Sequence, residues 1–145
     1  MGEVTYTGNV PISMPCAAEA IAEGKVYKDN GSRQMTIITA KGDVAQGVAA
    51  YSSLTDGSAK TLTAGDSMPF YLVGSGAIVE VASGNTETWS FGALVYLHDS
   101  VDGVVTTSTS SSTCIGTYWG TDGLVTSAAG ELIIVKLDRA PGATA

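Results

Sequence analysis

The sequence predicts a mainly β protein, either a compact β-barrel or a sandwich, built from two duplicated β units with at most one short helix. The composition supports this, because 18 of 145 residues are glycine and only 14% are charged. Short apolar segments alternate with glycine-containing turns, and one order of motifs occurs twice. A hydrophobic content of 44% argues against disorder. We expect an arm at 1–15, one β domain at 16–138 and a flexible tail at 139–145.

The arm is expected to be extended, because four apolar residues alternate along it with period two: Val4, Tyr6, Val10 and Ile12. Pro11 and Pro15 remove backbone donors, which restricts this segment to a sheet edge. It is either a frayed terminus or a strand that docks on a partner. Residues 16–23 have a helical composition but can form only one or two turns.

The first β unit begins with a predicted hairpin. Val26 and Tyr27 precede Asn30-Gly31, a strong two-residue turn signal, and residues 35–39 form the returning strand. Further strands are expected at 47–51, 68–73 and 77–81. Turns separate them at 55–57 and 64–66.

The second unit repeats the first. Residues 92–105 read as a strand, an Asp-Gly turn and a second strand, as residues 24–31 do in the first unit. The separation of matching motifs drifts slowly, between 69 (95 − 26) and 65 (129 − 64). The matches are Gly8 with Gly76, Gly24 with Gly92, Val26-Tyr27 with Val95-Tyr96, Gly47 with Gly116, 55–57 with 121–123, and 64–66 with 129–131. The repeat therefore covers about residues 8–73 and 76–137, and two such units can close on each other.

The charge excludes one class of partner. The net charge is −7 and the seven basic residues are scattered, so nucleic acid is not expected to bind. No apolar run approaches the roughly 20 residues of a membrane helix. The start of the chain lacks the features of a signal peptide, so synthesis in a cytoplasm is expected. Cys16 and Cys114 lack metal-ligand spacing and are either two free thiols or one bridge, within or between subunits.

No catalytic, cofactor or metal site is expected, so we predict that the protein is not an enzyme. Gly65-Asp66-Ser67 is similar to the start of one esterase motif, but an activated serine needs a base within reach. The only histidine, His98, is expected at a strand end or turn with its ring in solvent. Gly65-Asp66 is more simply explained as a turn, because the matching turn of the second unit has Gly130-Glu131 and no serine after it.

The large aromatic residues of the second unit belong either to the core or to an interface. The candidates for a subunit interface are Trp89, Tyr118 and Trp119. The same three residues define an alternative function, a β-rich binding module such as a tail or adhesin domain that recognises glycan or a host surface. Protection of tryptophan fluorescence by sugars favours that alternative.

The order of motifs resembles the small capsid cement, or head decoration, proteins of tailed bacteriophages. The motifs lie at 24–27, 47–50, 64–66, 92–96, 102–104, 115–116 and 129–137. The resemblance implies a homotrimer on the outer capsid surface of the virion, at three-fold positions, where it binds the major capsid protein and stabilises the expanded head. It also implies that the arm, with Val4, Tyr6, Val10 and Ile12, contacts the capsid. The Ser/Thr-rich segment 106–113 is longer than expected and leaves a host-attachment role open.

Overall fold

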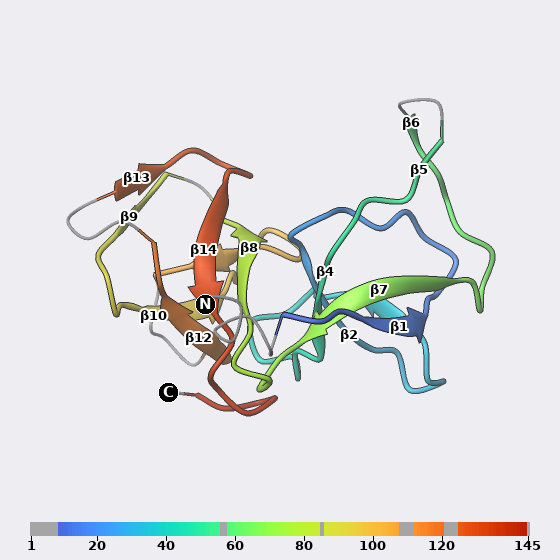
Figure 1. The fold of residues 1–145 in the computed structure, drawn as a ribbon, viewed down its shortest axis with the longest axis horizontal. Helices are drawn as coiled ribbons and strands as arrows, with labels where there is room; N and C mark the ends of the chain where they lie inside the picture. The colour runs from blue at the N-terminus through green and yellow to red at the C-terminus, as the bar shows by residue number, and fades with distance from the viewer. Residues whose placement is uncertain (1–8, 56–57, 85, 108–111, 121–124, 145) are drawn as a thin grey trace, which may run out of the picture.

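The fold is all β and consists of two lobes that lie side by side (Figure 1). It is seen in a computed structural model that describes residues 9–55, 58–84, 86–107, 112–120 and 125–144. Each lobe contains one five-stranded antiparallel sheet. No helix occurs among these described residues. The first lobe comprises residues 9–73, and the second comprises residues 77–137.

The first sheet has the strand order β1-β7-β4-β2-β3. Its strands are β1 (Ile12–Pro15), β7 (Ser67–Leu72), β4 (Gly47–Ala49), β2 (Val26–Asp29) and β3 (Met35–Ile37). A short hairpin of β5 (Leu54–Thr55) and β6 (Ser58–Ala59) projects from this lobe (Figure 1).

The second sheet has the strand order β8-β14-β12-β10-β11. Its strands are β8 (Ile78–Ala82), β14 (Leu132–Lys136), β12 (Cys114–Tyr118), β10 (Leu94–Leu97) and β11 (Val105–Thr106). β9 (Glu87–Trp89) and β13 (Val125–Ser127) form a separate antiparallel pair beside it.

The two sheets have the same topology. β1, β7, β4, β2 and β3 correspond in order to β8, β14, β12, β10 and β11. Isolated bridges repeat as well, because Cys16 pairs with Met35 in the first lobe as Ser83 pairs with Val105 in the second. The predicted mainly β class from two duplicated units is therefore confirmed. The barrel alternative is wrong, because neither sheet closes on itself, and the arrangement is sandwich-like.

The pairing register corrects one predicted match. Tyr27 lies opposite Gly47, and Val95 lies opposite Gly116, so Val95 and not Tyr96 corresponds to Tyr27. A register shift between Val95 and Tyr96 displaces the second unit by one residue. Gly8, residues 56–57 and residues 121–123 lie outside the described residues, so two of the matched pairs cannot be followed.

Two local predictions also change. Residues 16–23 form no helix, because the N–H groups of Ile21, Ala22 and Glu23 donate to side-chain hydroxyls of other segments and not to carbonyls one turn earlier. The predicted hairpin of β2 and β3 is present, but its loop contains five residues, 30–34, and not two. The Asp29 carboxylate organises that loop by accepting hydrogen bonds from the N–H groups of Gly31 and Arg33, both at 3.1 Å.

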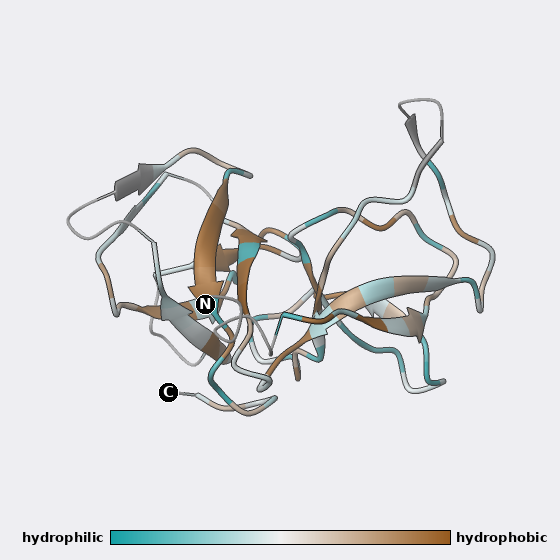
Figure 2. Cartoon of the chain, in the orientation of Figure 1, coloured by the Kyte–Doolittle hydropathy of each residue, from teal (hydrophilic) through white to brown (hydrophobic). Residues whose placement is uncertain are grey.

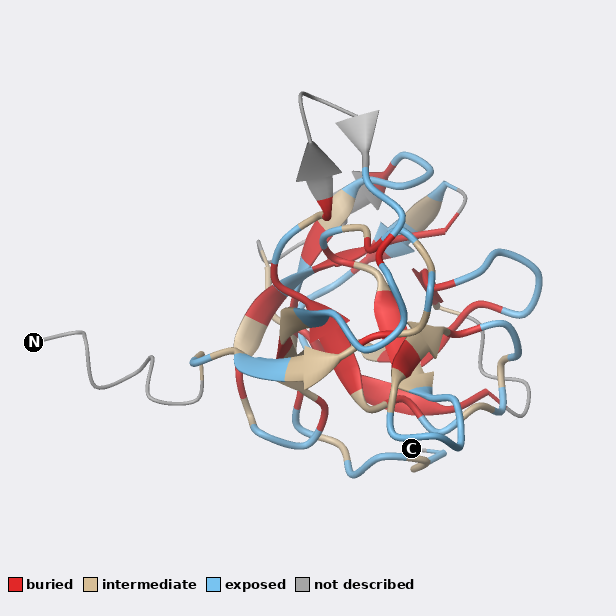
Figure 3. Ribbon diagram, turned by 90° about the vertical axis from the view of Figure 1, so that its right-hand side faces the viewer, coloured by how far each residue is buried: buried red, intermediate tan, exposed pale blue. Residues whose placement is uncertain are grey.

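The main core fills the inner face of the second sheet, and β14 and β8 are hydrophobic along much of their length (Figure 2). Val26 and Val48 of the first sheet belong to the same core, so one face of the first sheet packs on the second lobe. The opposite face carries a smaller cluster that includes Tyr27 and Phe70, with ring centroids 5.4 Å apart. The buried strand segments lie inside a rim of exposed loops (Figure 3).

Candidate interaction surfaces

The segment predicted as an arm joins the body of the protein. Val10 and Ile12 are 65% and 45% exposed, whereas Val4 and Tyr6 lie outside the described residues. All four residues of β1 pair with β7, so Ile12 is part of the first sheet. Val10 is therefore the one predicted arm residue that the structure describes and that lies outside the first sheet.

Asn9 fastens the start of this segment to the other lobe. Its side-chain amide donates to the Ile78 carbonyl at 2.6 Å, and its side-chain carbonyl accepts from the Ile78 N–H at 2.8 Å. Ile78 lies on β8, an edge strand of the second sheet. One side chain thus satisfies both backbone groups of an edge residue and protects that part of the edge from other strands.

Two of the three aromatic candidates are core residues. Trp89 and Tyr118 are 0% and 3% exposed, and their rings stack at 5.7 Å. The Trp89 indole N–H donates to the Ser127 hydroxyl at 3.0 Å. These two side chains hold the second lobe together and are not accessible to a subunit or a glycan.

Trp119 lies at the surface, as the interface interpretation requires. Its ring is 4.7 Å from that of Phe91, which is 47% exposed, and the Lys136 ammonium lies 4.7 Å from the centroid of its ring. The backbone N–H of Trp119 donates to Ile134, which is 37% exposed. Phe91, Trp119 and Ile134 form an apolar surface on the second lobe.

His98 is buried, contrary to the expectation of a ring in solvent. Its Nδ1 accepts hydrogen bonds from the N–H groups of Ser100 and Val101, both at 3.1 Å. The ring packs on Gly84, where any Cβ would overlap with it. Because Nδ1 already accepts two hydrogen bonds, it is not free to act as a base. Ser67 lies on β7 of the first sheet, opposite Pro15, so no hydrolytic pair is formed by these two described residues.

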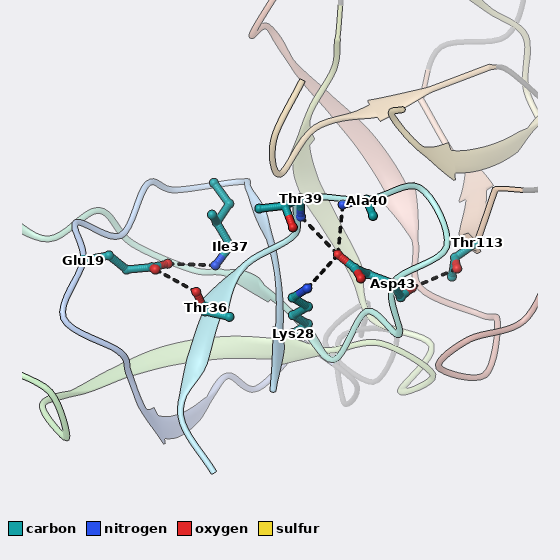
Figure 4. Close-up of polar contacts among 8 residues, drawn as sticks. All are labelled: Glu19, Lys28, Thr36, Ile37, Thr39, Ala40, Asp43 and Thr113. Atoms are coloured by element: carbon teal, nitrogen blue, oxygen red, sulfur yellow. Dashed lines mark hydrogen bonds and ion pairs between the residues drawn. The ribbon is translucent and has the colours of Figure 1, made fainter. Parts of the chain in front are cut away.

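The carboxylate of Asp43 is occupied by hydrogen bonds within the first lobe, where Asp43 lies in the loop between β3 and β4 (Figure 4). It accepts from Lys28 Nζ at 2.9 Å and from the N–H groups of Thr39 and Ala40 at 3.1 and 3.0 Å. Burial opposes ionisation, but these donors outweigh it and hold the pKa of Asp43 below its usual range. The Asp43 carbonyl also accepts from the Thr113 hydroxyl at 2.8 Å, which ties the loop to the second lobe.

The two cysteines are free, buried thiols in different lobes. Burial raises the pKa of both Cys16 and Cys114, so both remain protonated and unreactive at neutral pH. Among the described residues, no group of three or more His, Cys, Asp or Glu side chains is placed to hold a metal ion. The described part of the chain also has no helix that is long and apolar enough to span a membrane.

A groove of about 340 Å³ opens on the first lobe. Its apolar part is formed by Met14, Met35 and Leu72. The other lining residues are Pro15, Asp29, Arg33, Gln34 and Gln46. This groove was not predicted from the sequence, because its residues come from four separate segments. A comparison of these segments with their counterparts in the second unit, where polar residues become apolar, is the signal that would have found it.

A second hollow, of about 250 Å³, lies between the lobes and is lined by residues of both sheets, including Ala50, Tyr71, Ile78 and Ile134. Glu23 and Glu80 add two carboxylates to its lining.

Comparison of the chain with protein-family models, with curated proteins and with solved structures finds no match. The candidate sites are therefore defined by their geometry and chemistry alone.

Proposed function

We propose that this protein is a structural capsid decoration protein, which binds the outside of an expanded bacteriophage head at three-fold sites and stabilises it. The observation that carries the proposal is the exposed apolar segment at Val10 and Ile12, which Asn9 and β1 hold in a fixed position on the body. The order of motifs in the sequence supports the same function. Binding the expanded shell and not its precursor would stabilise that state by mass action.

The chemistry of the described residues fits a structural protein better than an enzyme. The Nδ1 atom of His98 and the carboxylate of Asp43 are engaged in loops, and both cysteines are buried. Large apolar side chains are nevertheless exposed, among them Val10, Ile12, Phe91 and Ile134. Neighbouring exposed apolar residues, such as Val10 and Ile12, are typical of surfaces that meet another protein.

The test is to add the purified protein to undecorated heads and to measure occupancy of the three-fold sites by electron microscopy. Val10→Asp should abolish occupancy, because it places a charge in the proposed contact. Val44→Asp is the matched control, since Val44 is also exposed, at 48%, but lies outside the proposed contact, in the loop between β3 and β4. Failure of the unmodified protein to bind expanded heads overturns the proposal, as does normal binding by Val10→Asp.

The alternative, a glycan-binding module, is favoured by one observation only. Trp119 and Phe91 present two neighbouring rings at the surface of the second lobe. Trp89 and Tyr118 no longer support it, because both are buried. A sugar that protects tryptophan fluorescence from quenching in the unmodified protein, and has no such effect on the Trp89 fluorescence left in Trp119→Ala, would replace the capsid proposal with this one.

A further inference from the structure

Part of the contact between the two lobes is made by backbone hydrogen bonds at the start of β2. The Val26 N–H donates to the Gly103 carbonyl at 2.8 Å, and the Gly103 N–H donates to the Ile38 carbonyl at 3.0 Å. The Ala82 N–H donates to the Gly24 carbonyl at 2.8 Å. The edge at 24–26 of the first lobe therefore covers the part of the second lobe that contains Ala82 and Gly103.

The surface that receives this edge has a counterpart on the first lobe, and that counterpart is the open groove. The eight groove residues Met14, Pro15, Asp29, Arg33, Gln34, Met35, Gln46 and Leu72 correspond to Val81, Ala82, Leu97, Gly103, Val104, Val105, Ile115 and Leu137. Every one of the eight counterparts is buried. The groove is thus the same surface of the repeated fold without the edge that covers it.

The covering edge also has a counterpart, at 91–94 of the second lobe, and it is open too. Gly24 is buried, and a Cβ there would overlap with Leu132, whereas Gly92 is exposed with no atom within 4 Å of a Cβ. Val26 is buried, whereas its counterpart Leu94 is only partly so. Phe91, next to Gly92, is 47% exposed.

We propose that copies of this chain associate head to tail, with the edge at 91–94 of one copy in the groove of the next copy. The contact between copies would repeat the contact between the two lobes of one chain. Such a heterologous interface generates a closed ring or an open filament, according to the rotation between neighbours. The proposal concerns contacts between copies and does not depend on capsid binding.

The side chains at the two contacts differ in a complementary way. In the contact within the chain, Gly103 packs against Ile37 and Lys25. In the groove, Arg33 takes the place of Gly103, and both have positive φ, 61° and 73°. The counterparts of Ile37 and Lys25 are Thr107 and Ala93, which are smaller. Between copies, the large Arg33 of the groove would therefore meet small residues of the edge. Within the chain, the small Gly103 meets the larger Ile37 and Lys25.

Two differences make the contact between copies weaker than the contact within the chain. Pro15 replaces Ala82 and has no N–H, so the hydrogen bond from Ala82 to the edge has no equivalent. Asp29, Gln34 and Gln46 replace buried apolar residues at the groove rim. A polar rim around an apolar centre is the usual composition of an interface between separately folded proteins. We therefore expect reversible, concentration-dependent assembly.

The test measures the mass of the full chain by sedimentation and native mass spectrometry over a wide concentration range. Phe91→Asp places a charge on the edge, and Gln46→Trp fills the groove. Each variant alone should be monomeric, whereas Val44→Asp should assemble like the unmodified protein. Far-ultraviolet circular dichroism checks that all variants are folded.

Mixing the two variants separates this interface from a symmetric one. The Phe91→Asp copy keeps a working groove and the Gln46→Trp copy keeps a working edge, so an equal mixture should form heterodimers and nothing larger. The double variant should remain monomeric. A monomeric unmodified protein at every concentration overturns the proposal, and so does assembly that neither variant weakens or a mixture that stays monomeric.

Discussion

Glu19 and Glu87 make the same contact in the two lobes. Each carboxylate accepts a hydrogen bond from a threonine hydroxyl and from the next backbone N–H along an edge strand. For Glu19 the donors are the Thr36 hydroxyl and the Ile37 N–H, both at 2.8 Å (Figure 4). For Glu87 they are the Thr106 hydroxyl and the Thr107 N–H, the latter at 3.3 Å. Because β3 and β11 are outer strands, each glutamate satisfies an edge donor that would otherwise be open to another chain.

Removal of the Glu19 carboxylate, which caps the edge strand β3, should destabilise the protein and expose that edge. Glu19→Ala leaves the Ile37 N–H without its acceptor, which is expected to cost about 1–3 kcal/mol of unfolding free energy. Glu19→Gln keeps an oxygen acceptor and should lose less. Urea unfolding measures the cost, and light scattering measures aggregation. Glu23→Ala is the control, because Glu23 is an exposed carboxylate nearby. Equal stability of Glu19→Ala and Glu23→Ala would contradict the capping role.

Gly24 and Gly92 form a matched pair for measuring the contact between lobes. Their φ angles are 81° and 86°, so alanine is strained at either position, by about 1–2 kcal/mol. Only at Gly24 does the new Cβ also overlap with Leu132 and approach the Ala82 nitrogen at 3.3 Å. Gly24→Ala should therefore lower the unfolding free energy more than Gly92→Ala does. Equal losses, measured at a concentration where both are monomeric, would show that the lobes are not tightly packed there.

Asp43 should make stability depend on acid pH. Its pKa is lowered in the folded state, so its contribution is present above the unfolded-state pKa of about 3.9 and is lost as the pH falls through the lower folded-state value. Asp43→Asn removes this dependence and also leaves Lys28 without its ion pair. Urea unfolding between neutral and acid pH should give a flatter curve for the variant. Parallel curves for the two proteins would contradict the assignment.

The sequence was sufficient for the β class and the duplication, because both follow from local turn and strand signals. Gly65 and Gly130, for example, have positive φ in equivalent turns, and both turns were predicted from Ala-Gly followed by an acid. The register was not predictable to the residue. The shift between Val95 and Tyr96 depends on how two strands meet, and a repeated Val-Tyr pair concealed it.

Burial was also beyond the reach of local patterns. His98 follows a strand and was expected in solvent, but the Ser100 and Val101 N–H groups and the absence of a side chain at Gly84 create a buried place for its ring. Trp89 and Trp119 are both aromatic residues near strand ends, and tertiary packing alone decides that the first is fully buried and the second only partly buried. The groove could not be predicted for the same reason. It is open because no edge covers it, whereas the edge at 24–26 covers the equivalent surface of the second lobe.

Tyr27 should make stability depend on alkaline pH. Burial raises its pKa to about 12, although the hydrogen bond from the Ala22 N–H to its oxygen at 2.9 Å acts in the opposite direction. The unfolded chain releases the phenolic proton near pH 10, about two pH units earlier than the folded protein, so stability falls as the pH rises through this range.

Tyr27→Phe should therefore have a flatter stability curve above about pH 10. At neutral pH it should be less stable by about 1 kcal/mol, because the hydrogen bond to the Ala22 N–H is lost. Tyr51→Phe is the control, since Tyr51 is 61% exposed. Urea unfolding of all three proteins at increasing pH makes the comparison. If Tyr27→Phe lost stability with pH as steeply as the unmodified protein, the alkaline dependence would have to come from another group.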